Sequence, residues 1–332
     1  MAPIKGPKGA PEPGRTAEYR RSGKQKSFAE ERGNPREGER WNMNIEKLEN
    51  QQDQLRLLNL RVWQKGNMVL SKDWEEDIRR NIYSASKSFT SLAVGIAARE
   101  GLLSLDEKLC DAFPKELPEK AGEYLEQATV KDLLTMGLGQ DAPYLMGGQR
   151  VCMEETDWVR FCLSRPFTHR PGEMFLYSNV GPYLAGVLVQ RRCGCRLTDY
   201  LMPRLFEPLG IRPTVWEIDP AGYTFGAGGL FLSAGEMLKV GQLLLQNGCW
   251  EGRQLVPAEY LKQASQQQID NGKFGYGFLF WMGDYGSWRA DGKYGQTSVM
   301  LPRQQAVIVT TAESRDPQME QKCLDVIVPQ LM

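Results

Sequence analysis

The pattern of hydrophobic and polar residues along the first third of the chain predicts two helices and a β-hairpin. A polar segment with three apolar positions on one side predicts a helix over residues 44–55. Residues 58–74 hold two short apolar runs on either side of Gly66-Asn67, which predicts a hairpin with a tight turn. Residues 84–100 place apolar side chains at helical spacing, so they predict a well-buried helix.

The rest of the chain divides into a helical part and a strand-rich part. Residues 104–225 contain helical segments separated by loops rich in proline and glycine, at Thr129–Met136, Asp157–Leu163 and Pro182–Val189. Four short β-rich runs follow at residues 276–282, 287–292, 296–302 and 305–313. The final segment, residues 317–331, returns to the pattern of a helix with one apolar face.

This order of elements predicts an α+β sandwich that is interrupted by a helical region. We assign residues 41–103 and 226–332 to the sandwich and residues 104–225 to a helical subdomain. Residues 1–40 carry ten Lys or Arg, eleven Gly or Pro and few large apolar side chains. Such a composition cannot offset the entropy of ordering, so this tail is predicted to be disordered.

The charge balance argues against a nucleic-acid-binding role for the whole chain. Lys and Arg number 41, as do Asp and Glu, so the formal net charge at pH 7 is zero. That zero is the sum of +4 in residues 1–40 and −4 in the remainder. We expect no nucleic-acid partner. Binding by the basic tail is an alternative, and it would require an affinity that collapses with salt and is lost when the tail is deleted.

The histidine and cysteine contents exclude several kinds of site. The single histidine, His169, rules out any site that needs two imidazoles, and without a motif partner we expect a structural or surface role for it. The seven cysteines have no framework spacing and indicate reduced thiols, with Cys193-Gly-Cys195 an incidental pair. The stretch Gly226–Gly229 lacks the Lys-Ser/Thr of a phosphate-binding loop, so it predicts a turn.

Ser84 and Lys87 are the first candidates for chemistry. They lie three residues apart at the predicted start of a helix, so the hydroxyl and the amine point along one face. Burial would lower the pKa of Lys87 and allow it to accept the Ser84 proton, and free N–H groups at a helix start can stabilise an oxyanion. The pair alone leaves an alternative open, a helix-capping serine beside a solvated lysine.

Three phrases occur in the order expected for one family: IYSASKSFTSLAVG at residues 82–95, YSN at residues 177–179 and ADGKYGQ at residues 290–296. In these the chain resembles the serine β-lactamase and penicillin-binding-protein superfamily, specifically its class C β-lactamase-like branch of esterases, amidases and peptidases. The resemblance implies a β-lactamase/transpeptidase-like α+β fold. In that fold an antiparallel sheet is flanked by N- and C-terminal helices and accompanied by a mostly helical subdomain.

The same resemblance implies a role for each motif residue. Ser84 would be the acylated nucleophile and Lys87 its activating partner. Tyr177 would be the general base or proton shuttle, with its phenol acidified by neighbouring cationic charge. Asn179 would orient the acyl side of the substrate by hydrogen bonding. Without the family, Tyr177 would be interpreted as a buried aromatic residue in a loop.

The third motif departs from the family pattern. The family usually carries Lys-Thr-Gly, Lys-Ser-Gly or His-Thr-Gly, whereas this chain has Ala290-Asp291-Gly292. The cation that would meet a substrate carboxylate is missing, which weakens the β-lactam and D-alanyl-peptide interpretations. Arg289 or Lys293 could replace it if either faced the cleft, and Asp291 could equally be a turn residue. Gly292 would allow close approach of backbone to substrate, and the N–H of Lys293 is implied as the second oxyanion donor.

We therefore predict a serine hydrolase that cleaves a small-molecule ester or amide through a Ser84 acyl-enzyme, with no metal or organic cofactor. Two alternatives stay open: a true β-lactamase or D-Ala-D-Ala carboxypeptidase, and a catalytically silent binding protein with the same fold. The sequence has no apolar leader region and no apolar run of about 18 residues, which predicts a cytoplasmic protein without a membrane partner. The oligomeric state does not follow from the sequence. The expected substrate-binding residues are Asn179, Asp291, Gly292 and Lys293.

Overall fold

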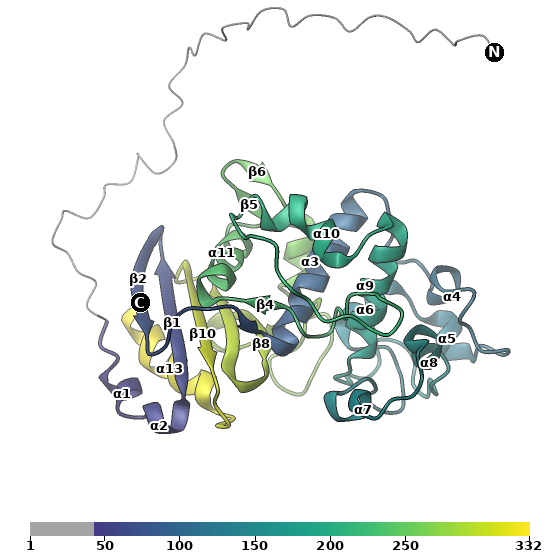
Figure 1. Cartoon of the computed structure of the whole chain (residues 1–332), viewed down its shortest axis with the longest axis horizontal. Coiled ribbons are helices and arrows are strands. Elements are labelled where there is room, and N and C mark those ends of the chain that lie inside the picture. The colour runs from purple at the N-terminus through teal and green to yellow at the C-terminus, as the bar shows by residue number, and fades with distance from the viewer. Residues whose placement is uncertain (1–42) are drawn as a thin grey trace, which may run out of the picture. The chain divides into compact units, whose positions relative to one another are not determined.

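A six-stranded antiparallel sheet with the order β2-β1-β10-β9-β8-β7 forms the centre of the computed structural model, which describes residues 43–332 (Figure 1). The prediction for residues 1–40 lies outside the described residues. The strands of this sheet are β1 Leu57–Gln64, β2 Asn67–Asp73, β7 Trp281–Met282, β8 Trp288–Gly292, β9 Gln296–Leu301 and β10 Ala306–Ala312. Two further pairs are β3 Arg80–Asn81 with β4 Phe231–Leu232, and β5 Cys249–Trp250 with β6 Arg253–Gln254.

Helices cover both faces of the sheet, as Figure 1 shows. One face carries α1 Glu46–Glu49, α2 Gln52–Leu55 and α13 Met319–Ile327, and the other carries α3 Ser86–Arg99 and α11 Ala234–Leu245. The remaining α-helices are α4 Leu109–Ala112, α5 Glu123–Gln127, α6 Val130–Thr135, α7 Gly147–Val151, α8 Trp158–Leu163, α9 Val180–Cys193, α10 Leu197–Leu201 and α12 Ala258–Ala264. Short helical turns are η1 Tyr83–Ala85, η2 Met202–Phe206, η3 Asp284–Gly286, η4 Lys293–Gly295 and η5 Val328–Gln330. The α+β prediction is confirmed.

The two faces of the sheet belong to separate apolar cores. On β10, Val307 and Val309 contact the core of α3 and α11, whereas Ile308 contacts the core of α1 and α13. Successive side chains of a strand point to opposite faces, so a strand covered on both faces is apolar without alternation. β10 is buried along its whole length for this reason.

The predicted hairpin is confirmed, with its turn one residue earlier than expected. Lys65 and Gly66 have φ of 47° and 92°, and Asn67 is already the first residue of β2. Positive φ at both central residues is the requirement of the tight turn that matches the twist of paired strands.

Two predicted elements are wrong in detail. The helix over residues 44–55 breaks at Gln51, where φ is −110° and ψ is 12°, and it becomes α1 and α2. Of the run at residues 276–282, only the last two residues form a strand. The backbone before them bonds to helical segments instead, because Leu279 N–H donates to Leu134 O and Leu279 O accepts from Ser88 Oγ.

The pattern gave no element between Gly229 and Tyr276, yet α11 and α12 lie there. The start of α11 is a capping box, in which Ser233 Oγ accepts from Glu236 N–H and the Glu236 carboxylate accepts from Ser233 N–H. Ser, then Glu three residues later, before an apolar run is the sequence signal of such a start. That signal could have located α11.

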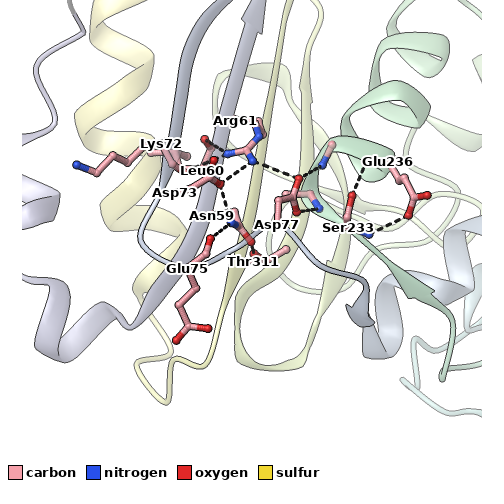
Figure 2. A network of polar contacts seen from close by, with 12 residues as sticks. Asn59, Leu60, Arg61, Lys72, Asp73, Glu75, Asp77, Ser233, Glu236 and Thr311 are labelled. Atoms are coloured by element: carbon pink, nitrogen blue, oxygen red, sulfur yellow. Dashed lines mark hydrogen bonds and ion pairs between the residues drawn. The ribbon is translucent and has the colours of Figure 1, made fainter.

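A partly buried ionic network ties β1 to the start of α11 (Figure 2). Arg61 on β1 is 6% exposed, and its guanidinium lies 2.6 Å from Asp73 and 3.2 Å from Asp77. Asp77 also accepts from the N–H groups of Ala234 and Gly235, the first residues of α11, at 2.8 and 3.0 Å. A carboxylate at a helix start satisfies free N–H groups and opposes the helix dipole. The network thereby fixes the segment that leads from β2 to Ser84.

The Asp77→Ala substitution tests the weight of this network. It leaves two helix N–H groups unpaired and Arg61 with one carboxylate, so we expect the free energy of unfolding to fall by about 2–4 kcal/mol. Urea denaturation followed by circular dichroism measures the change. Glu75→Ala is the matched control, because Glu75 is 57% exposed and its ion pair with Arg80 should contribute under about 1 kcal/mol. Equal losses in the two variants would contradict the assignment.

Candidate active site

Ser84 lies in η1, just before α3, and Lys87 lies in the first turn of α3. Lys87 Nζ donates to Ser84 Oγ at 3.0 Å and to the carbonyl oxygen of Ala227 at 2.7 Å. Lys87 is 1% exposed, and no carboxylate among residues 43–332 forms an ion pair with it. The structure therefore brings the two residues of the first motif into direct contact.

The environment of Lys87 makes its amine a base. Burial, with a smaller contribution from the positive charge of Arg150, lowers the pKa of Lys87 to about 7. The physical reason is that an ammonium loses its hydration in a buried position and gains no carboxylate in return. At neutral pH a large fraction of the Lys87 amine is uncharged, so it can accept the proton of Ser84.

Arg150 is a feature that sequence reasoning missed. It lies in α7, forms an ion pair with Glu217, and places its guanidinium 4.0 Å from the ring centroid of Phe225. No motif marks this arginine in the sequence. Its effect on Lys87 follows only from the folding of α7 toward the site.

Tyr177 lies in the loop before α9, with its ring stacked on Trp281 at 5.4 Å and its centroid 5.0 Å from Lys87 Nζ. Burial raises the pKa of Tyr177 to about 12. A hydrogen bond with Ser84 opposes this shift, and the negative charge of Asp291 adds to it. The expectation that cationic charge would acidify this phenol is wrong, because burial outweighs the other influences. Tyr177 stays protonated at neutral pH and is suited to donate.

Asn179 caps the start of α9 and connects the tyrosine loop to a neighbouring segment. Its Nδ2 donates to Leu145 O at 2.8 Å, and Ser178 Oγ accepts from Tyr144 N–H at 3.1 Å. The buried Oδ1 of Asn179 has no hydrogen-bond partner among the described residues. The position therefore retains an unused acceptor two residues from Tyr177.

The third motif lies on β8, whose alternation separates its residues by face. Ala290 is 4% exposed and faces the apolar core, so no charge is presented there. Arg289 and Asp291 share the opposite face, with Arg289 Nε 3.2 Å from Asp291 Oδ2 and 2.8 Å from Glu320 Oε1. Lys293 is exposed, with Nζ 4.6 Å from the ring centroid of Tyr294. Of the two possible replacement cations, one is shared by two carboxylates and the other lies at the surface.

Gly292 brings β8 against the turn that carries the nucleophile. A Cβ added there would clash with Ile82 O and lie 3.2 Å from Ala85 N. The close approach is thus made to the backbone of η1. Tyr83 and Tyr294, next to Ser84 and Lys293, have positive φ of 48° and 65°, and their rings pack edge to face at 5.3 Å. Such conformations persist where surrounding packing holds them, so this contact fixes the spacing between η1 and η4.

Three further features noted in the sequence are the glycine-rich stretch at residues 226–229, His169 and the Cys193/Cys195 pair. Of these, only the glycine-rich stretch contacts the catalytic candidates. The predicted turn at Gly226–Gly229 is confirmed, and its Ala227 carbonyl accepts from Lys87, a role the sequence did not reveal. His169 donates through its backbone N–H to Gly139 O. Cys193 Sγ and Cys195 Sγ lie 3.4 Å apart as free thiols. Within residues 43–332, no group of three or more His, Cys, Asp or Glu is arranged to hold a metal ion.

Comparison with known proteins places this site in a family. A family model described as Beta-lactamase matches residues 45–330. The chain belongs to the beta-lactamase family. The β-lactamase/transpeptidase-like fold expected from the three motifs is confirmed by this match and by solved structures with the same fold.

Similar proteins include solved structures described as hydrolases and as penicillin-binding proteins. Protein flp of Staphylococcus aureus is 30% identical over 141 residues, which is 41% of this chain and 28% of that protein's length. An uncharacterized protein of Alkalihalophilus pseudofirmus is 24% identical over 72% of this chain and 75% of its own. A putative 6-aminohexanoate-dimer hydrolase from Bacillus anthracis has a TM-score of 0.74 at 18% identity, covering 86% of this chain and 81% of its own. EstCE1, described as a hydrolase with promiscuous acyltransferase activity, has a TM-score of 0.67 at 15% identity, covering 84% of this chain and 96% of its own.

Membership of this family indicates an enzyme of the serine hydrolase type. In the part of the chain that the structure describes, no helix combines the length and apolar character needed to cross a membrane.

The Gly292→Ala substitution tests the contact between β8 and η1. The added methyl group must displace Ile82 O, which is backbone, so we expect a loss of about 1–3 kcal/mol in the free energy of unfolding and a shift of Lys293 away from Ser84. Urea denaturation measures the first, and the rate at which a fluorophosphonate labels Ser84 reports the second. Gly122→Ala is the matched control, since nothing lies within 4 Å of its added Cβ. A Gly292→Ala protein as stable and as reactive as the control would contradict the close approach.

Proposed function

We propose that this chain is a serine hydrolase that cleaves an ester or amide bond of a small molecule through an acyl-enzyme on Ser84. The observation that carries the proposal is the 3.0 Å hydrogen bond between Lys87 Nζ and Ser84 Oγ, made by a lysine whose pKa lies at about 7. A serine hydroxyl becomes a nucleophile when an adjacent base can take its proton. A capping serine beside a solvated lysine would not bury the amine.

The geometry supports Lys87 as the general base and Tyr177 as the general acid. Lys87, uncharged, accepts the Ser84 proton while Oγ bonds to the substrate carbonyl carbon. The resulting oxyanion is held by the N–H groups of Ser84 and Lys293, and the close contact of Gly292 with the backbone around η1 supports this pairing. Tyr177 donates its proton to the leaving oxygen or nitrogen and regains one from Lys87. Water then attacks the acyl-enzyme and releases the acid, and Asn179 orients the acyl side.

The third motif supports an esterase or amidase of the class C-like branch over a cell-wall enzyme. Ala290 faces the core, and Arg289 is shared by Asp291 and Glu320, so β8 itself offers no unpaired cation to a substrate carboxylate. The printed descriptions of EstCE1 and of the putative 6-aminohexanoate-dimer hydrolase are in keeping with ester or amide cleavage. A cytoplasmic location is part of the same proposal, supported by seven cysteines present as free thiols.

Two substrates separate this proposal from the β-lactamase alternative. We expect turnover of p-nitrophenyl acetate and a kcat/KM for nitrocefin at least about 100-fold lower, because the nitrocefin carboxylate would approach Asp291 and Glu320, which already share the guanidinium of Arg289. Release of p-nitrophenol and opening of the chromogenic lactam both give absorbance signals. Ser84→Ala supplies the blank for each. Nitrocefin turnover that matched or exceeded ester turnover would overturn the preference.

The pH dependence of Ser84 labelling tests the role of Lys87. The labelling rate with a fluorophosphonate should rise with pH and level off above about 7, since the uncharged amine that accepts the proton is the form present above the lysine pKa. Ser84→Ala should not be labelled, and Lys87→Arg, which stays charged, should be labelled at least about 100-fold more slowly. A rate constant that did not change between pH 5 and 9 would remove Lys87 as the base. Absence of labelling in the unaltered protein would support the silent binding protein.

A further inference from the structure

A cavity of about 420 Å³ lies beside the end of β8 that packs against η1, the turn that carries Ser84. It lies between β8, η4 and the start of α13, and Gly292 and Lys293 form the part of its wall nearest to η1. Its other lining residues include Arg289, Asp291, Thr297 and Glu320. Because Lys293 lines this cavity and its N–H is the proposed second oxyanion donor, a substrate held at that donor would have the cavity beside it.

Three cationic and three acidic side chains line this cavity, and they are paired unequally. Arg289 Nε lies 3.2 Å from Asp291 Oδ2 and 2.8 Å from Glu320 Oε1, so one guanidinium serves two carboxylates. The third lining carboxylate, Asp316, is already matched by Lys322 at 2.7 Å. Lys293 and Arg315 also line the cavity, but both are exposed, so solvent and salt screen their charges. Arg289, Asp291 and Glu320 form a triad. This triad has one positive and two negative charges when both acids are ionised, so one negative charge is uncompensated.

The protonation behaviour of the triad agrees with that imbalance. Burial raises the pKa of Glu320 to about 7, with Arg289 opposing the shift and Asp291 adding to it, and burial also raises the pKa of Asp291. A carboxyl group in this position holds its proton because burial penalises its charged form more than the shared guanidinium of Arg289 stabilises it.

We propose that the cavity is a substrate subsite that selects a positively charged group, an ammonium or another protonated amine, through Asp291 and Glu320. This inference rests on the proposed function and names its substrate class. A bound cation would give two positive charges to two carboxylates in a partly desolvated space, where charge-assisted hydrogen bonds are strong. An anionic group would face two acids, and a neutral group would leave the imbalance unchanged.

The pH dependence of such binding follows from the groups around Glu320. These are Arg289 and Asp291 on β8, Lys293 on η4, Arg315 and Asp316 in the segment before α13, and Lys322 and Cys323 on α13 itself. A cation binds the ionised form of Glu320 more tightly, so the preference for a cation should increase as pH rises through about 7.

Three phenylboronic acids of matched size provide the test, with meta-aminomethyl, meta-ethyl and meta-carboxyl substituents. The boron of each bonds to Ser84 Oγ as the hydroxyl proton passes to Lys87, so the substituent projects from the nucleophile. Isothermal titration calorimetry at pH 6 and pH 8 gives the dissociation constants. At pH 8 we expect the aminomethyl compound to bind about tenfold more tightly than the ethyl compound, and the carboxyl compound to bind weakest. At pH 6 the aminomethyl preference should shrink.

Two variants assign the preference to the triad. Glu320→Gln should reduce the aminomethyl preference at pH 8 about tenfold and remove its pH dependence, and Glu320→Asp should restore part of both. Glu313→Gln is the matched control, because Glu313 is an exposed acid paired with Arg56 outside the cavity. Equal binding of the three compounds, or a preference that survives in Glu320→Gln, would overturn the inference alone. Binding of none of them to the unaltered protein would overturn the proposed function as well. The pH series on the unaltered protein decides the question even if Glu320→Gln does not fold.

Discussion

The burial of the Lys87 amine without a carboxylate is the constraint on which the site depends. A free lysine and a free tyrosine lose their protons at nearly the same pH, so in water neither is the better base for the other. Burial acts on them in opposite directions, because it penalises the charged ammonium of Lys87 and the charged phenolate of Tyr177. The pKa of the lysine falls to about 7 and that of the tyrosine rises to about 12. Groups separated in this way can act as base and acid beside one serine.

The fold maintains this burial through contacts that converge on α3. Thr90 Oγ1 donates to Gly226 O at 2.7 Å, and a side chain at Gly226 would meet Pro182 O at 2.7 Å. The turn that carries Ala227 is thereby held between α3 and α9. The Ala227 carbonyl then accepts a hydrogen bond from Lys87 Nζ, so the buried amine has a neutral acceptor in place of a carboxylate. A carboxylate in that place would stabilise the ammonium and remove the base.

Sequence reasoning succeeded where chemistry depends on local spacing. The three-residue separation of Ser84 and Lys87 guarantees that both side chains share one side of a helical turn, and they are in contact. The two-sided burial of β10 likewise follows from an uninterrupted apolar run. Both the contact and the burial depend only on residues that are close in the sequence. They need no knowledge of the rest of the chain.

Sequence reasoning failed where a pKa shift or a local structure depends on which segments, far apart in the chain, pack together. The direction of the Tyr177 shift is set by burial against Trp281 and by Asp291, and neither neighbour is visible from the YSN triplet. Residues 276–282 have the composition of a strand, yet the backbone of Leu279 is engaged by α3 and α6. The contacts of Ala227 with Lys87 and of Glu320 with Arg289 join residues far apart in the chain.

The alternation of β8 connects the missing third-motif cation with the acidity of the site. Ala290 turns toward the apolar core between α3 and α11, so a charge lost there is not replaced on that face. Every charge of the strand instead lies on the opposite face, where Asp291 is paired with Arg289 and also raises the pKa of Tyr177. One carboxylate therefore acts on two properties, the sign of charge that the neighbouring cavity accepts and the protonation of the phenol. A positive group bound beside Asp291 would weaken its hold on the Tyr177 proton, which would make the phenol a better donor when the cavity is filled.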